Sequence, residues 1–155
     1  MTRGTAILLT NFKSVTTCEF NGDMYIEPDS NGQILLYHLE NVKTVRQFKR
    51  AIEKFNDDCF GYTGIPLHLT VKKFKSIKFK ESTYFKDWFS DYLFFLNISW
   101  FKRKIIDMDG KEFELLPGEL AVFYFGKFYM SYNFHFRKYS YVPLPTPQQV
   151  SAKQS

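Results

Sequence analysis

The segment that decides the fold is Ser82–Trp100, STYFKDWFSDYLFFLNISW, the most apolar stretch of the chain. Polar residues such as Lys86 and Asp91 interrupt it at positions that leave one helical face apolar. The large side chains on that face recur at helical spacing: Phe85, Trp88, Phe89, Tyr92, Leu93 and Leu96. This period is typical of an amphipathic helix. We therefore predict a core helix over Thr83–Leu96 that packs against the strand-like segments on either side of it.

Segments typical of β-strands precede the predicted core helix. Thr5–Phe12 and Ser14–Phe20 are rich in β-branched and aromatic residues, and the second run ends at Asn21-Gly22, a strong signal for a two-residue hairpin. A strand over Asp23–Glu27 follows, and the turn-forming residues PDSNG separate it from another strand over Gln33–Glu40. This part of the chain therefore predicts a four-stranded antiparallel meander.

A second helix is predicted over Val45–Phe55. Thr44 and Gln47 have the spacing of a capping box, in which the threonine hydroxyl accepts a hydrogen bond from the Gln47 backbone and the glutamine side chain reaches back to the cap. One face of this helix is apolar, so it is expected to pack on a sheet. The opposite face is cationic and carries Arg46, Lys49, Arg50 and Lys54.

The C-terminal half again favours β-structure. Leu67–Val71 alternates apolar and polar residues, as a strand does. Asp109-Gly110 and Pro117-Gly118 are turn signals between further strands. The longest alternation runs from Phe128 to Arg137 and predicts a strand with one buried face and one solvent-facing face.

Together these elements predict a single α+β domain over residues 1–142 with mostly antiparallel sheet. The predicted order is four strands, a helix, two strands, a helix and four strands. Pro143–Ser155 is rich in proline and polar residues, so we expect an extended or disordered tail. The helices are expected to bury seven large side chains against sheet: Phe48, Ile52, Phe55, Phe85, Trp88, Phe89 and Leu93.

Composition limits the environment and the partners. The formal net charge of +5 over 155 residues permits an anionic partner. Cys18 and Cys59 lack the spacing of a metal or redox motif, which favours reduced, buried thiols. The N-terminal apolar run is too short for a signal peptide, and no apolar stretch has the length of a membrane span. We therefore expect a cytoplasmic protein, or one of another reducing intracellular compartment, with no membrane association.

The leading functional hypothesis is a small basic nucleic-acid-binding protein without catalytic activity. Lysines are concentrated in KKFKSIKFK over residues 72–80, and further cations lie on the face of the predicted helix. The solvent-facing side of the last long strand adds an aromatic ring and groups that bind phosphate. The expected contacts are Lys72, Lys73, Lys75, Lys78, Lys80, Arg46, Lys49, Arg50, Tyr129, His135 and Arg137. All of this requires the basic clusters to share one face.

A protein-binding or inhibitory module is the alternative. Aromatic residues make up 19% of the chain, which is more than one core readily hides. Exposed tyrosines are favoured in protein interfaces because they bring a large contact area at little entropic cost. Tyr139, Tyr141 and the proline-rich tail are the candidate contacts.

A phosphodiesterase is a further alternative, based on Pro66–Val71, PLHLTV. His68-x-Thr70 on a strand is similar to the repeated signature of the 2H phosphoesterase family, whose two histidines act as general acid and base while the hydroxyls bind the phosphate. The resemblance implies catalytic roles for His68, Thr70 and a second histidine. The comparable position is His135, where Arg137 stands in place of the expected hydroxyl residue.

Metal-dependent chemistry has one candidate segment, Asp107–Glu112. Asp109-x-Lys111 resembles the carboxylate-lysine pairing of some metal-dependent nucleases, and Asp107, Asp109 and Glu112 are the candidate ligands. The Asp-Gly pair explains the same segment as a hairpin tip. Phosphate-binding glycine loops, nucleophile elbows and dinucleotide fingerprints are missing from the sequence, so we expect no cofactor and no bound metal.

Overall fold

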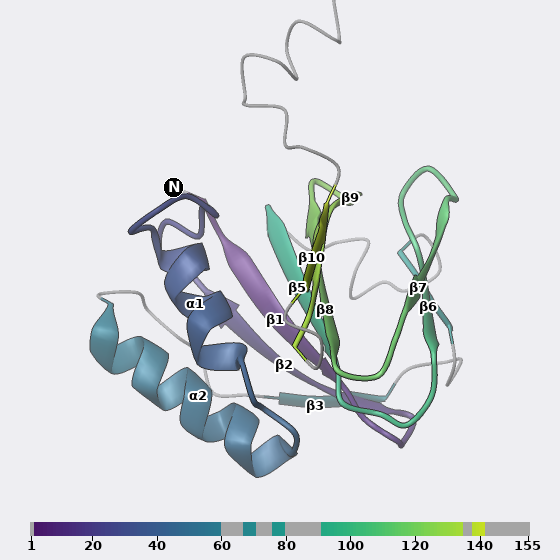
Figure 1. Cartoon of the computed structure of the whole chain (residues 1–155), viewed down its shortest axis with the longest axis horizontal. Coiled ribbons are helices and arrows are strands. Elements are labelled where there is room, and N and C mark those ends of the chain that lie inside the picture. Colours follow the sequence, from purple (N-terminus) through teal and green to yellow (C-terminus); the bar gives the residue numbers. More distant parts are fainter. Residues whose placement is uncertain (1, 60–66, 71–75, 80–90, 135–137, 142–155) are drawn as a thin grey trace, which may run out of the picture.

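The structure is a computed structural model, and it describes residues 2–59, 67–70, 76–79, 91–134 and 138–141. These residues form three layers (Figure 1). The middle layer is a seven-stranded sheet. Helices α1 (Asn31–Leu39) and α2 (Val45–Asp58) cover one face of it, and a three-stranded sheet covers the other.

Among the described residues, six of the eight strand pairs in the two sheets are antiparallel, and two helices pack on the larger sheet, which confirms the predicted α+β class. The middle sheet has the order β10-β9-β8-β5-β1-β2-β3, in which only the β1–β5 pair is parallel. The outer sheet has the order β4-β6-β7, with a parallel β4–β6 pair. The strands are β1 (Gly4–Leu9), β2 (Ser14–Phe20), β3 (Leu67–Thr70), β4 (Ser76–Lys78), β5 (Tyr92–Asn97), β6 (Arg103–Ile106), β7 (Glu112–Leu115), β8 (Glu119–Tyr124), β9 (Lys127–Asn133) and β10 (Lys138–Tyr141).

The prediction of a central helix over Thr83–Leu96 is wrong where the segment is described. Tyr92–Asn97 is the strand β5, which pairs with β1 and β8 and has all six residues buried. Its side chains alternate between the two cores, with Phe94 under the helices and Phe95 under the outer sheet. A strand covered on both faces needs apolar residues at every position, so it lacks the alternation of a half-exposed strand. Phe85, Trp88 and Phe89 lie outside the described residues.

Two predicted strands before α2 are also wrong. Asp23–Glu27 forms no strand, and the predicted hairpin at Asn21-Gly22 therefore does not form. Gln33–Glu40 falls largely in α1, where Leu35, Leu36 and Leu39 are buried. Leu35 and Leu39 satisfy the period of a strand as well as that of a helix, but Leu36 faces the core only in a helix. The chain therefore leaves the sheet after β2 and builds the helical layer.

The start of α1 is fixed by close contact with the preceding turn. The Ser30 hydroxyl accepts a hydrogen bond from the Glu27 backbone N–H at 2.8 Å, and the Ile34 N–H donates to the Ser30 carbonyl at 3.1 Å. Gly32 donates its backbone N–H to the Tyr25 carbonyl at 3.1 Å. A side chain at Gly32 would collide with the carbonyl oxygens of the turn, so this helix can approach only with glycine here.

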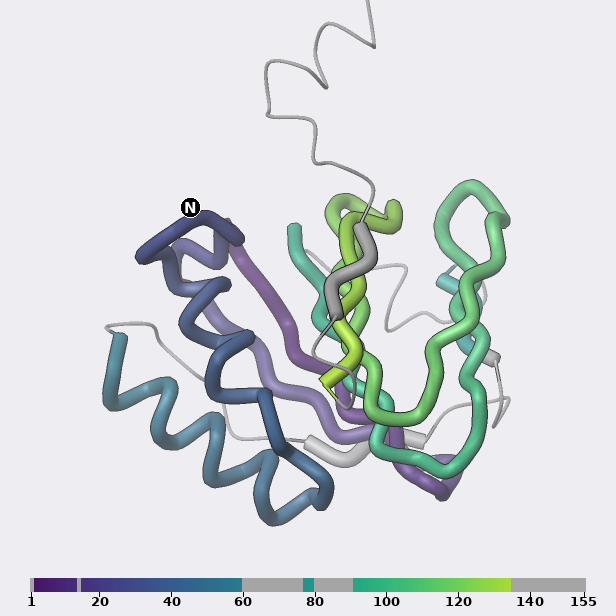
Figure 2. Tube along the Cα trace, viewed as in Figure 1, coloured from purple at the N-terminus to yellow at the C-terminus, as the bar shows by residue number. Residues whose placement is uncertain are grey.

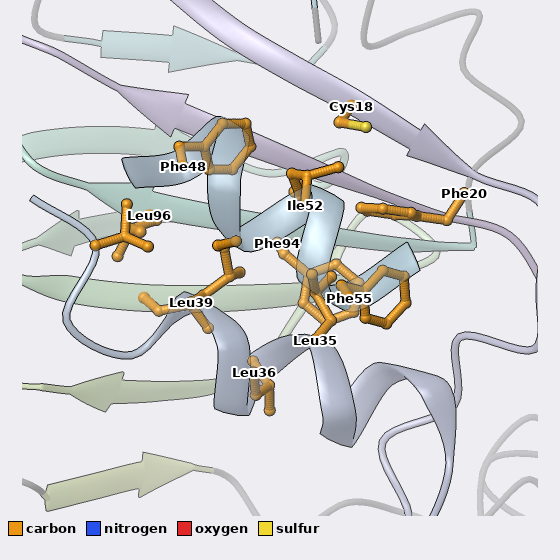
Figure 3. Packing of buried hydrophobic residues seen from close by; sticks show 14 of the residues in the cluster. Cys18, Phe20, Leu35, Leu36, Leu39, Phe48, Ile52, Phe55, Phe94 and Leu96 are labelled. Carbon is orange, nitrogen blue, oxygen red and sulfur yellow. The ribbon is translucent and has the colours of Figure 1, made fainter. Parts of the chain in front are cut away.

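The predicted helix over Val45–Phe55 is confirmed as α2, and it ends three residues later. Figure 3 shows how it packs with α1 on the sheet. The Phe55 ring meets the edge of Phe20 from β2, with centroids 5.0 Å apart. Phe48 and Ile52 are buried beside it, as predicted. This first core fills the space between the helices and the middle sheet.

A second core lies on the other face of the middle sheet. Phe79, directly after β4, stacks on Phe95 with centroids 5.8 Å apart and contacts Phe123 of β8 at 5.3 Å. Ile105 of β6 and Leu115 of β7 complete the cover of this face. The outer sheet is therefore held by apolar packing.

The turn predictions at Asp109-Gly110 and Pro117-Gly118 are confirmed. Gly110 and Gly118 have φ of 84° and 77°, the left-handed backbone that favours glycine. The strict alternation predicted from Phe128 to Arg137 is wrong at its start, because a bulge pairs Val122 with Met130 but Phe123 with Phe128. Phe128 therefore packs with the second core and Met130 with the first.

The order of elements along the chain differs from the predicted one. Two strands are followed by both helices and then by eight strands in the described residues. The proline-rich segment from Pro143 lies outside the described residues, as do His135 and Arg137.

Candidate nucleic-acid interface

The cationic face of α2 is the first component of the candidate interface. Thr44 caps the helix by accepting a hydrogen bond from the Gln47 N–H at 3.1 Å, and the Gln47 side chain accepts one from the Lys43 N–H at 2.7 Å. This closes the capping box one residue earlier than predicted. Burial of the apolar face then leaves the opposite face in solvent. All four of its cations are exposed: Arg46, Lys49, Arg50 and Lys54.

Three of these cations form a row along α2. Arg46, Arg50 and Lys54 follow one another at i+4 spacing, which separates their positions by about 6 Å along the helix axis. Arg50 and Lys54 line an open groove of about 410 Å³ between the two helices. The groove therefore has a positively charged wall.

The opposite wall of the groove is aromatic and polar. Tyr37 and His38 of α1 line it, together with Asn41 and one carboxylate, Glu40, in the connection to α2. The Tyr37 side chain is 73% exposed, so its ring face is open to a ligand. Gln47, in the first turn of α2, adds a side-chain amide to the lining of the groove. An exposed ring next to a cationic row is the combination that binds bases and phosphates of a single strand.

His38 fixes the two walls relative to each other. Its Nε2 lies 2.6 Å from Oδ2 of Asp58 at the end of α2. Its ring also meets the edges of Tyr37 and Phe55, with centroids 5.5 and 6.5 Å away. Because the imidazole is largely buried while Asp58 is exposed, this pair acts as a structural link between the helices.

The structure does not bring together all the residues predicted to contact nucleic acid. Lys78 lies in β4 of the outer sheet, on the face of the middle sheet opposite to α2. Tyr129 is half-buried, with its ring 5.8 Å from that of Tyr92. The remaining predicted contacts lie outside the described residues: Lys72, Lys73, Lys75, Lys80, His135 and Arg137.

The phosphodiesterase hypothesis depends on two histidines in one cleft. His68 and Thr70 belong to β3, an edge strand that pairs with β2 through His68–Thr16 and Thr70–Ser14. Four strands separate β3 from β9, the strand that precedes His135, which corresponds to about 24 Å across the sheet. His135 itself is outside the described residues, so this hypothesis stays a prediction.

The carboxylates of the proposed metal segment have other partners. Asp107 is buried, and its Oδ1 accepts hydrogen bonds from the N–H groups of Asp109 and Lys111, both at 2.9 Å. Asp109 lies 3.6 Å from the Lys127 ammonium, and Glu112 lies 3.2 Å from that of Lys104. Asp107 therefore shapes the hairpin tip. Within the described ranges, no three Asp, Glu, His or Cys residues are grouped to hold a metal ion.

Sequence reasoning identified the cations of α2 but missed the wall that faces them. The sequence predicts Tyr37 and His38 in a strand over Gln33–Glu40 with Asn41 directly after it, which gives these residues no relation to α2. The signal that was present is the apolar spacing Leu35, Leu36 and Leu39, which fits a helix.

No model of a known protein family, no curated protein and no solved structure matches this chain. Among the helices of the described residues, none combines the length and the apolar character needed to cross a bilayer.

Proposed function

We propose that this protein binds single-stranded nucleic acid, without catalysis, through the groove between α1 and α2. The observation that carries the proposal is the exposed ring of Tyr37 across the groove from Arg50 and Lys54, with Arg46 exposed in the same i+4 row of α2. In this arrangement the cations contact consecutive phosphates and the tyrosine stacks on an unpaired base. Asn41 and Gln47 offer amides for hydrogen bonds to the strand.

A single strand fits this groove better than a duplex does. The Tyr37 ring can stack on a base only if that base is unpaired and unstacked from its neighbours. Such stacking is worth about 1–3 kcal/mol per base, and it depends little on sequence because every base has a π-face. We therefore expect weak sequence preference.

The salt dependence of binding tests the role of the cations. Each phosphate contact to a single strand contributes on the order of 0.7 to the slope of log affinity against log salt. The row of three should therefore account for a slope of about −2. Fluorescence anisotropy with labelled DNA and RNA oligonucleotides of mixed sequence, at several salt concentrations, measures this slope on the full chain.

A pair of matched variants makes the test specific. Arg46→Gln/Arg50→Gln/Lys54→Gln should weaken binding at low salt and remove about 2 from the slope. The control is Lys104→Gln/Lys111→Gln/Lys127→Gln, which removes the same charge from β6, from the β6–β7 hairpin and from the lysine of β9 that pairs with this hairpin. The control variant loses two ion pairs, Lys104–Glu112 and Lys127–Asp109, which are exposed and contribute little to stability. Equal losses in the two variants, or no binding by the wild type at low salt, would exclude the proposal.

A further inference from the structure

A second surface is formed by three loops at one end of the molecule. We name it the loop end, and it consists of Asn11–Lys13 between β1 and β2, Ile98–Lys102 between β5 and β6, and Leu116–Gly118 between β7 and β8. The first two loops lie together because β1 and β5 are parallel neighbours. Figure 2 shows these loops next to one another at the lower edge of the view.

The loop end holds most of the exposed apolar side chains in the described residues. Trp100 is 83% exposed and Phe12 is 72% exposed, and Phe101 and Leu116 are partly exposed at 39% and 37%. Trp100 and Phe12 alone present roughly 300 Å² of aromatic surface. That lies at the lower end of the range for the largest apolar patch of a typical monomer, and such patches are often functional.

Hydrogen bonds hold these loops in one arrangement. The Trp100 N–H donates to Oδ1 of Asn11 at 2.8 Å, which ties the Trp100 loop to the Phe12 loop. The buried amide of Asn97 donates to the carbonyls of Phe101 and Leu115 at 2.8 and 3.0 Å. The exposed rings therefore stand on fixed backbone, so binding costs little ordering.

The charge of the loop end is positive. Lys13 and Lys102 are exposed beside the rings, and the three loops contain no Asp or Glu. Behind them, Arg103 is buried and donates through Nη1 to the Thr10 carbonyl at 2.7 Å. Burial lowers the pKa of this guanidinium only to about 10, so it stays charged at neutral pH. A ligand of this surface must combine apolar groups with negative charge.

We propose that the loop end docks an acidic, apolar peptide segment of another protein, with large side chains of the segment against Trp100 and Phe12 and its carboxylates at Lys13 and Lys102. This inference uses none of the residues of the α1–α2 groove and stands apart from the nucleic-acid proposal. It places the energetic centre of the interface at Trp100, the residue type most enriched among hot spots.

Other occupants fit the surface less well. A second copy of this chain in a symmetric dimer would bring the same lysines together, which costs free energy. The chain's own proline-rich segment, 143–155, has Lys153 and no acidic residue. A bilayer gains about 1 kcal/mol from each lysine, so two lysines give weak attraction, and it does not require the fixed backbone seen at Trp100.

Selection of random displayed peptides on the full-length protein tests this proposal. We expect enrichment of acidic peptides with large apolar residues. Synthetic versions of the enriched peptides, measured by fluorescence anisotropy, should bind Trp100→Ala at least about tenfold more weakly than wild type. They should also bind Lys13→Glu/Lys102→Glu more weakly. Phe125→Ser is the control, because Phe125 is 63% exposed and lies in the turn after β8.

Several outcomes separate the alternatives. Because Trp100 is exposed, Trp100→Ala should keep the wild-type melting temperature, and a lowered one would count against this surface. Peptides that bind Trp100→Ala and wild type equally would overturn the proposal. Trp100-dependent binding to phosphatidylserine vesicles, or Trp100-dependent dimerisation in sedimentation, without such peptides would overturn it in favour of a membrane or a second copy. Loss of oligonucleotide binding alone would leave it standing.

Discussion

Individual tyrosines connect the end of the middle sheet into one aromatic cluster. The ring of Tyr92 lies 4.6 Å from Tyr124, 5.8 Å from Tyr129 and 6.3 Å from Tyr25, measured between centroids. Burial is the main reason that the pKa of Tyr92 is raised, and it raises the pKa of Tyr129 to about 12. Neighbouring phenols and Glu27 add to both shifts. Ionisation of these hydroxyls therefore costs free energy in the folded state.

At this scale we predict a loss of stability at alkaline pH. A raised pKa means that the folded state keeps a proton that the unfolded state loses, so stability is complete below the unfolded pKa and falls as pH rises above it. Burial raises the pKa of Cys18 from 9.0 to about 12, so the decline starts near pH 9 and the tyrosines add to it from pH 10 to 12. Urea unfolding between pH 7 and 11 measures this. Tyr92→Phe should flatten the decline, and the exposed Tyr37→Phe should keep the wild-type slope.

At the scale of elements, local signals located turns and the capped helix but misassigned segments whose conformation depends on distant partners. Thr44, Gln47 and Asp109-Gly110 act within a few residues, so their sequence is sufficient. The six consecutive buried residues Tyr92–Asn97 fit a strand that is covered on both faces. In the sequence, however, Tyr92, Leu93 and Leu96 continue the helical spacing of Trp88 and Phe89, so the pattern predicts a helix. The deciding facts are the pairing with β1 and the cover of both faces, which no local window contains.

The position of β5 between two cores predicts the cost of truncating it. Phe94 is fully buried under the helices, so Phe94→Ala should lower the free energy of unfolding by about 3–5 kcal/mol. Phe125→Ala, at an exposed ring, is the control and should change it by less than about 1 kcal/mol. Chemical denaturation monitored by circular dichroism provides both values. A Phe94→Ala variant as stable as wild type would show that this face of β5 is not core.

At the scale of the molecule, the candidate interface shows that the sequence does not reveal which basic residues share a surface. Arg46, Lys49 and Arg50 were recognised because they share one helix face. Lys78 was grouped with them by charge, yet the middle sheet stands between β4 and α2. Which charges share a surface is decided by the three-layer arrangement, and that depends on contacts between residues far apart in the chain.

The helical layer and the outer sheet both pack on the middle sheet, and this predicts that the three layers unfold together. The five apolar residues of β5, Tyr92–Leu96, each pack into one core or the other, so loss of either cover exposes apolar surface on the strand that both depend on. Phe55→Ala in the helical layer and Phe79→Ala in the outer layer should therefore each lower the midpoint of one common thermal transition. Far-ultraviolet circular dichroism follows the helices, which lie on one face alone, and near-ultraviolet dichroism follows aromatic packing in both cores. Coincident curves for both variants are expected. If Phe79→Ala instead gives a near-ultraviolet transition at lower temperature while the far-ultraviolet curve stays in place, the outer sheet is a separate unit, held to the helical half by less free energy than its buried phenylalanines suggest.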